Sequence, residues 1–238
     1  GTMRIITSRC KLTRLIAGAL TALFAMGMAG SASAGGIALG GTRVIYPQGD
    51  KQASLAIINS STNTTFLIQS WVSNAEGAKS ADFVITPPLF VIHPKKENTL
   101  RIMYVGPDLP VDRESVFYLN SKAIPSVEKN KLSGNTLQIA TQSVIKLFIR
   151  PKKLPSLSID APKTLTCSVT NGKVTITNPS PYYVSLVQFF VGSTQLANNM
   201  VAPKNNLVVE IPGGGTGSVR FQTVNDFGAN TPVQSCAK

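Results

Sequence analysis

The chain has 238 residues and is basic, with 23 lysine and arginine residues against 11 aspartate and glutamate residues, one histidine and three cysteines. Such a charge often indicates a nucleic acid partner, but no arginine-rich or aromatic-interleaved binding motif is present. His93, the single histidine, stands in a turn-like stretch without a nucleophile motif or a paired metal ligand. We therefore predict no catalytic site, cofactor, bound metal or nucleic acid partner.

The first segment has the pattern of a secretory signal peptide. Four basic residues precede an apolar run at residues 15–29, and small residues follow as far as Ala34. Because the run is too short for a comfortable membrane span, we predict cleavage after Ala34 and no membrane insertion. Met3 is the expected start, preceded by an artificial addition or an upstream extension. Removal of residues 1–34 leaves 19 basic against 11 acidic residues, a net charge of +8, which favours acidic surfaces or carboxylates as partners.

Short segments with the alternation of β-strands occupy the next part of the chain, with turn residues between them and no helical period. A series of this kind predicts a β-sandwich. A proline- and lysine-rich stretch, Pro151 to Ser156, then interrupts the pattern and is typical of an interdomain linker. The predicted strands are Ile37–Tyr46, Ser54–Asn59, Thr65–Ser73, Asp82–Ile85, Thr99–Val105, Ser115–Ala123 and Leu137–Ile149.

A second strand series follows the linker and predicts a second, smaller sandwich. The expected domain boundaries are therefore residues 35–153 and residues 154–238. The strands predicted for the second domain are Thr164–Val169, Lys173–Thr177, Tyr183–Val191, Leu207–Ile211, Ser218–Val224 and Pro232–Cys236.

Two cysteines remain once Cys10 leaves with the signal peptide. In an oxidising compartment, Cys167 and Cys236 are expected to form a disulfide within the second domain. The alternative, two free or metal-binding thiols, lacks the neighbouring histidine and cysteine ligands of a zinc site.

Three ionic residues interrupt or adjoin the predicted strands of the first domain. Arg43 lies in the first strand, Glu114 precedes an apolar run, and Lys146 lies between Ile145 and Leu147. Buried charges are costly unless they are paired, so residue type alone suggests that each points to solvent. The strand of Lys146 alternates like an edge strand with one apolar face, an arrangement suited to pairing with a second chain.

Several ordered motifs carry a family resemblance. The chain resembles the periplasmic pilus chaperones of the chaperone–usher pathway, most closely the type 1 fimbrial branch, over essentially the whole mature sequence. The motifs are GGTRVIYP at 40–47, TNTTFLIQSW at 62–71, TPPLF at 86–90, KKENTLRI at 95–102, DRESVFYLN at 112–120, AIPS at 123–126, IKLFIRP at 145–151, NPSPYYVSL at 178–186 and VNDFGA at 224–229.

The resemblance implies an all-β protein with two immunoglobulin-like domains, arranged in an L with a subunit-binding cleft between them. Arg43 and Lys146 match the two cations that hold the C-terminal carboxylate of a pilus subunit. Leu137, Ile139 and Thr141 match the donor-strand positions that fill the open groove of that subunit. Relatives commonly carry a larger aliphatic residue in place of Thr141, so the third position departs from the family pattern.

The resemblance also implies that Glu114, Arg150 and Asp226 form an ionic cluster between the domains, rather than three separate surface charges. The expected function is that of a periplasmic chaperone, which binds and folds pilus subunits by donor-strand complementation and delivers them to an outer-membrane usher. The exposed edge strands would also allow weak self-association. The alternative function is that of a structural fimbrial subunit or adhesin built from tandem sandwiches.

Overall fold

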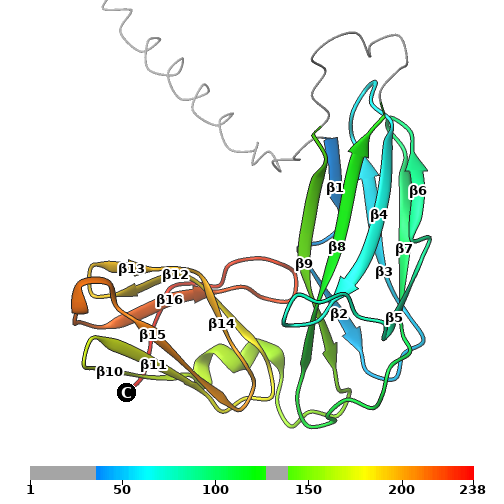
Figure 1. The fold of residues 1–238 in the computed structure, drawn as a ribbon. Helices are drawn as coiled ribbons and strands as arrows, with labels where there is room; N and C mark the ends of the chain where they lie inside the picture. Colours follow the sequence, from blue (N-terminus) through cyan, green and yellow to red (C-terminus); the bar gives the residue numbers. More distant parts are fainter. Residues whose placement is uncertain (1–35, 127–138) are drawn as a thin grey trace, which may run out of the picture. The chain divides into compact units, whose positions relative to one another are not determined.

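The computed structural model describes residues 36–126 and 139–238, and the structural statements below concern these residues. They form two all-β domains, each with its own hydrophobic core (Figure 1). Within these ranges, no helix has the length and apolar character needed to cross a membrane.

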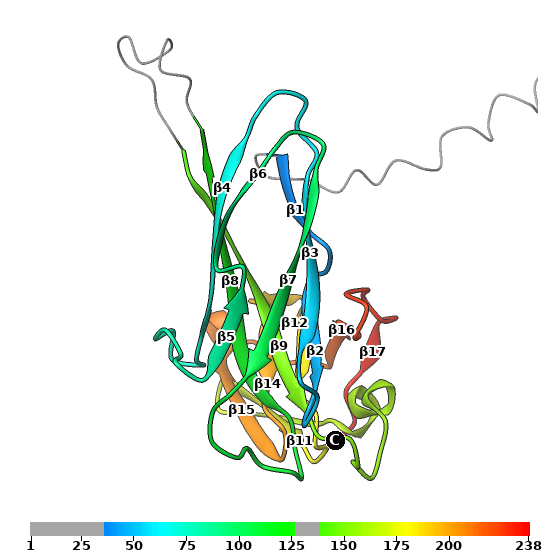
Figure 2. The same cartoon turned by 90° about the vertical axis from the view of Figure 1, so that its right-hand side faces the viewer.

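The first domain is a sandwich of two sheets (Figure 2). One sheet has the strand order β1-β3-β7-β5, and the other has the order β2-β9-β8-β4-β6. The strands are β1 (Ile37–Leu39), β2 (Arg43–Pro47), β3 (Ala53–Asn59), β4 (Phe66–Ser73), β5 (Phe83–Thr86), β6 (Leu89–Ile92), β7 (Glu97–Tyr104), β8 (Ser115–Pro125) and β9 (Thr141–Arg150).

Alternation along the strands builds the core of this sandwich. In β3, Leu55 and Ile57 are buried, and in β4, Phe66 and Ile68 are buried, because successive side chains of a strand point to opposite faces of its sheet. The side chains from the two sheets meet in a single apolar cluster. The cluster includes Leu147 and Ile149 of β9, so the C-terminal half of this strand is fixed by packing.

The segment predicted as one strand from Ile37 to Tyr46 is two strands that belong to different sheets. β1 pairs with β3, whereas β2 pairs in parallel with β9. The chain changes sheets at Gly40 and Gly41, where a side chain on Gly40 would lie only 3.0 Å from Ala56 Cβ. This crossing places Arg43 at the first position of β2.

Strand β6, which follows the two prolines of the TPPLF motif, was not predicted from the sequence. Of the described strands, β4 alone pairs with it, and two of its apolar side chains, Leu89 and Val91, are exposed. The prolines and the exposed apolar residues both weaken the alternation from which a buried strand is predicted.

The second domain is a smaller sandwich of a three-stranded and a five-stranded sheet. The first has the order β10-β11-β15, and the second has the order β13-β12-β16-β17 with β14 also on β12. Its elements are η3 (Ser158–Thr164), β10 (Thr166–Thr170), β11 (Lys173–Asn178), β12 (Val184–Val191), β13 (Thr194–Leu196), β14 (Asn199–Val201), β15 (Asn205–Glu210), η4 (Pro212–Gly214), β16 (Val219–Thr223) and β17 (Gln234–Ser235).

The short strands β13 and β14 and the 3-10 helix η3 were not predicted. Each of the two strands has only three residues, which is too short for alternation to be recognised. The helix directly follows the stretch predicted as a linker and contains Pro162. Its one buried residue is Ala161, so it shows no apolar face of the kind that identifies a helix in sequence.

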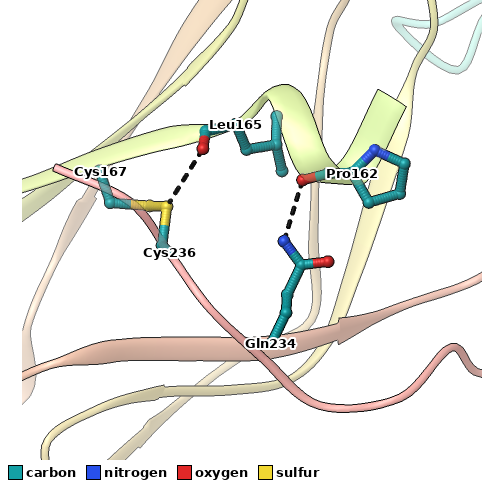
Figure 3. The surroundings of a disulfide bond; sticks show 5 residues. All are labelled: Pro162, Leu165, Cys167, Gln234 and Cys236. Atoms are coloured by element: carbon teal, nitrogen blue, oxygen red, sulfur yellow. Dashed lines mark hydrogen bonds between the residues drawn. A yellow bond between two sulfur atoms is a disulfide. The ribbon is translucent and has the colours of Figure 1, made fainter. Parts of the chain in front are cut away.

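The expected disulfide between Cys167 and Cys236 is present and joins the two sheets of the second domain (Figure 3). Cys167 lies in β10, and Cys236 directly follows β17. The same chain end is also held by backbone hydrogen bonds, since Cys167 N donates to the Ala237 carbonyl oxygen at 2.8 Å and Cys236 N donates to that of Val219 at 2.8 Å. Nearby, Gln234 Nε2 donates to the Pro162 carbonyl oxygen at 2.9 Å.

Replacing both cysteines, Cys167→Ala with Cys236→Ala, is expected to lower the free energy of unfolding of the second domain. The two cysteines are 69 residues apart in the sequence, and removing such a cross-link costs about 4 kcal/mol on the chain-entropy account. Hydrogen exchange of the β11 and β12 amides measures this domain separately from the first. The matched control replaces the exposed neighbours Ser168 and Ser235 by alanine, and equal exchange rates in the two variants would refute the prediction.

Candidate functional site

Strand β9 is an interior strand along one half and an edge strand along the other. Residues Lys146–Arg150 pair in parallel with β2, and residues Thr141–Ile149 pair antiparallel with β8 (Figure 1). Between Thr141 and Ile145, no described strand pairs with the opposite edge of β9. The prediction of an edge strand therefore applies only to the half that precedes Lys146.

Arg43 and Lys146 lie opposite each other where this free edge begins, because they are the first paired residues of the β2–β9 ladder. Arg43 Nη1 donates to the Val224 carbonyl oxygen at 3.5 Å, and its guanidinium carbon lies 5.5 Å from the centre of the Phe148 ring. Lys146 Nζ donates to Ser185 Oγ at 3.1 Å. Each cation is therefore held by a neutral group of the second domain.

Neither cation forms an ion pair with any described carboxylate. The Nε of Arg43 is buried and has no hydrogen-bond partner among the described residues. Burial lowers the pKa of Arg43, while Asp226 and Glu114 act in the opposite direction. The pKa of Lys146 is also lowered, first by burial and then by the positive charge of Arg43. Two partly buried cations without an acidic partner are costly, and an anion from outside the chain would relieve this cost.

Arg150 lies four residues beyond Lys146 in β9 and, unlike Lys146, has acidic partners. Its Nε donates to Glu114 Oε2 at 2.9 Å, and its two terminal nitrogens donate to the two carboxylate oxygens of Asp226, each at 2.8 Å. The guanidinium also stacks over the Tyr182 ring, 5.1 Å from its centre. The structure thus brings the three residues of the expected ionic cluster together.

Both acids of the cluster have further partners in the second domain. Glu114, whose residue is 3% exposed, accepts a hydrogen bond from Tyr183 N at 2.8 Å through Oε1. Asp226 accepts one from Ser158 Oγ at 2.9 Å. Burial raises the pKa of Glu114 against the opposing charge of Arg150, whereas the hydrogen bonds from Arg150 lower the pKa of the more exposed Asp226. The cluster therefore connects residues of both domains through hydrogen bonds to charged groups.

A pocket of about 100 Å³ lies beside Arg43. Its lining comes from both domains and includes Arg43 as well as the three residues of the ionic cluster. The lining residues that bear on the site are Arg43, Phe148, Arg150, Val224, Asp226 and Phe227.

Two of the three predicted donor-strand residues are described. Ile139 is 64% exposed, and Thr141, at the start of β9, is partly buried opposite Ala123 of β8. Leu137 lies outside the described residues. Ile139 and Thr141 have the same parity as Ile145, Leu147 and Ile149, which pack on the first core, so along a regular strand they would point to the same face of the sheet.

Sequence reasoning missed the groups that hold the two cations. Ser185 is 3% exposed within the apolar strand β12, where a single serine gives no indication of a contact with another domain. The Val224 carbonyl is a backbone group, for which residue type carries no information at all. Their roles depend on how the two domains meet, which local pattern does not determine.

Comparisons with known proteins agree with this geometry. Residues 36–155 match the family described as "Pili and flagellar-assembly chaperone, PapD N-terminal domain", and residues 160–235 match "Pili assembly chaperone PapD, C-terminal domain". The chain belongs to the pilus assembly chaperone family. This family is a non-enzymatic class, and the resemblance inferred from the sequence motifs is confirmed.

Two curated relatives from Escherichia coli strain K12 are named as chaperones. The probable fimbrial chaperone SfmC is 53% identical over 203 residues, which cover 85% of this chain and 88% of SfmC. The chaperone protein FimC is 47% identical over 219 residues, which cover 92% of this chain and 90% of FimC. A role as a fimbrial chaperone is therefore favoured over the alternative of a structural subunit.

Solved structures show the same two-domain β fold. The crystal structure of the periplasmic chaperone SfaE is 44% identical and superposes with a TM-score of 0.73, covering 85% of this chain and all of that one. A chain of the Salmonella enterica structure of the SafA pilin in complex with the SafB chaperone is 29% identical and superposes with a TM-score of 0.76. The match covers 85% of this chain and 96% of that one.

Asp226→Asn is expected to destabilise the protein at neutral pH but not in acid. Since the pKa of Asp226 is lowered in the folded state, its ionised form stabilises the fold above the ordinary aspartate pKa of 3.8, and this contribution disappears as the pH falls through the lowered value. At pH 7 we expect a loss of about 1–2 kcal/mol in the free energy of unfolding.

Urea denaturation from pH 7 down to pH 2 measures this difference. Asp160→Asn, at an exposed aspartate of η3, is the matched control and should follow the native protein at every pH. A difference between Asp226→Asn and the native protein that stays constant across this range would contradict the assignment.

Proposed function

We propose that this chaperone captures a pilus subunit by adding the subunit's C-terminal strand to the free edge of β9. The observation that carries the proposal is the pair Arg43 and Lys146, two cations without an acid, at the point where that edge begins. A terminal carboxylate carries the charge that both cations lack, and it can accept charge-assisted hydrogen bonds from each of them.

The site also determines the direction of the bound strand. If its terminal carboxylate lies at Arg43 and Lys146, the preceding residues extend along Ile145 towards Thr141 and Ile139. The strand then runs parallel to β9, as β2 does on the other side of Arg43. A fixed carboxylate fixes the register, which matters because a slip of one residue would turn every side chain to the wrong face.

The apolar side chains of the donor segment supply a second contribution. We propose that Leu137, Ile139 and Thr141 enter the open groove of the subunit, in donor-strand complementation of the kind known for chaperone–pilin pairs. Ile139 is exposed in the free protein, so its burial would contribute about 1.5–3 kcal/mol before the costs of binding. The SafA–SafB complex supports a pilin as the partner, because that related chaperone was solved with its pilin.

We further propose a periplasmic location, with residues 1–34 as signal peptide, residues 35–153 as the first domain and residues 154–238 as the second. The disulfide supports this location, because disulfides persist in oxidising compartments, as does the similarity to the periplasmic chaperone SfaE. Delivery of the bound subunit to an outer-membrane usher follows from the family resemblance, and the free half of β9 would also permit weak self-association.

Lys146→Ala is expected to abolish recognition of the carboxylate while leaving the free protein folded. Its lowered pKa shows that the folded protein disfavours this charge, so its removal should not reduce stability. Binding is measured with a short peptide of alternating valine and threonine that ends in a free carboxylate, and with the same peptide ending in an amide. The native protein should prefer the carboxylate by at least about tenfold, the effect of one hydrogen bond to a charged group.

The control is Lys173→Ala, at an exposed lysine of β11, which should keep the full preference. Co-purification of the native protein and Lys146→Ala with a pilin from a periplasmic extract extends the test to an intact subunit. An unchanged preference for the carboxylate in Lys146→Ala, or an equal yield of pilin, would overturn the proposed anchor.

Thr141→Leu is expected to change subunit affinity by about tenfold, because the added apolar groups correspond to about 1–2 kcal/mol on burial. Titration of the variant against each of its subunits would show a gain where the third pocket is open and a loss where it is shallow. Thr170→Leu, on the exposed face of β10, provides a matched control. Affinities equal to those of the native protein for every subunit would show that position 141 plays no part in binding.

A further inference from the structure

The chain contains the same five-residue turn twice, once in each domain. Residues 74–78 and residues 225–229 both have the sequence pattern Asn-x-x-Gly-Ala. In each turn the asparagine Oδ1 accepts hydrogen bonds from the second and fourth following amides, at 3.1 and 2.9 Å in the first and at 3.0 and 2.9 Å in the second. The first and last residues also pair through the backbone, at 2.8 and 2.9 Å.

The glycines of the two turns have the same backbone requirement. Gly77 has a φ of +87° and Gly228 a φ of +83°, a region that side chains with a Cβ rarely occupy. Each glycine amide donates to the carbonyl oxygen of its asparagine at 3.0 Å. Backbone strain would therefore be similar if either glycine were replaced by alanine.

The surroundings of the two glycines differ. A Cβ added to Gly77 would meet nothing within 4 Å, whereas a Cβ added to Gly228 would lie 2.1 Å from Thr42 Oγ1 and 3.3 Å from Thr42 Cβ. Thr42 belongs to the first domain and directly precedes Arg43. Gly228 is thus a point of close contact between the turn of the second domain and the residue next to the proposed anchor.

The turn that contains Gly228 also carries two other contacts with the first domain. Asp226 accepts two of the three hydrogen bonds from the Arg150 side chain, and the Val224 carbonyl, just before the turn, accepts the hydrogen bond from Arg43. Three contacts from the hydrogen-bonded turn and the residue directly before it depend on the same placement. A side chain at position 228 would displace that segment from Thr42 and would disturb the other two contacts.

We propose that Gly228 is a positioning residue for subunit recognition. By allowing the turn to lie against Thr42, it holds the Val224 carbonyl on Arg43 and so directs the guanidinium towards the incoming carboxylate. The effect on the carboxylate rests on the function proposed above, whereas the placement of the turn against Thr42 can be tested without any ligand.

The test compares Gly228→Ala with Gly77→Ala, which provides the backbone strain without the interdomain contact. Both variants should lose thermal stability from backbone strain, and Gly228→Ala should lose more, because it also disturbs the contact of Asp226 with Arg150. With the valine–threonine peptide pair, Gly77→Ala should keep the native preference for the carboxylate, and Gly228→Ala should lose most of it. Thr42→Ala removes the atom nearest to the added methyl group. The double variant Gly228→Ala with Thr42→Ala should therefore recover the preference for the carboxylate to within about threefold of the Thr42→Ala single variant. Its backbone strain at position 228 should remain that of Gly228→Ala alone.

A ligand-free measurement addresses the placement of the turn. In the Gly77→Ala background, Asp226→Asn should cost as much stability as in the native protein, but in the Gly228→Ala background it should cost much less, because its contact with Arg150 is already disturbed. An equal cost in both backgrounds would overturn the proposal. If the native protein does not distinguish the two peptides, the carboxylate anchor fails, while the stability cycle still decides whether Gly228 places the turn. If the native protein prefers the carboxylate peptide and Gly228→Ala keeps that preference, the positioning role of Gly228 is refuted, while the carboxylate anchor stands.

Discussion

The contact of Arg150 with Glu114 and Asp226 is the interaction on which the arrangement of the site depends. One guanidinium uses three of its nitrogens on two carboxylates, one from its own domain and one from the other. Glu114 is almost fully buried, so loss of Arg150 would leave an unpaired carboxylate in a low-dielectric environment, a costly state. The same contact places the segment that follows β16, and this segment supplies the carbonyl group on Arg43.

Strand β9 thus presents two cations in contrasting states only four positions apart. Arg150 has its charge balanced within the chain, and its pKa is raised by the hydrogen bonds and charges of its acids although burial opposes them. Among the described residues, Lys146 has a serine hydroxyl as its one side-chain partner, and burial and Arg43 both lower its pKa. Arg150 thus stabilises the free protein through its ion pairs, whereas the charge of Lys146 would be stabilised by an anionic ligand. A chain that satisfied both would have no electrostatic reason to bind a carboxylate at this point.

The sequence allowed much of the fold to be predicted, because most strands are long enough to show alternation and the turns between them are rich in glycine, proline and asparagine. The break at Gly40 was not recognised because both halves have strand character and only the pairing partners differ. The three ionic residues stood out as charges near apolar segments, but their roles came from family resemblance, since alternation alone would place each in solvent. The contacts of Ser185 and the Val224 carbonyl depend on the meeting of two domains, and nothing in the local sequence of either residue indicates it.

The pairing of β2 with only half of β9 has a consequence for which part of a partner chain can bind. A strand laid along the free edge would reach Arg43 and find β2 occupying the next position in the sheet. Any residue beyond its end would collide with β2, so an internal strand, whose chain continues in both directions, would be excluded unless it turned sharply away from the sheet. If a subunit strand binds there as proposed, β2 would act as a steric stop that selects for a chain terminus, in addition to the selection for a carboxylate by Arg43 and Lys146.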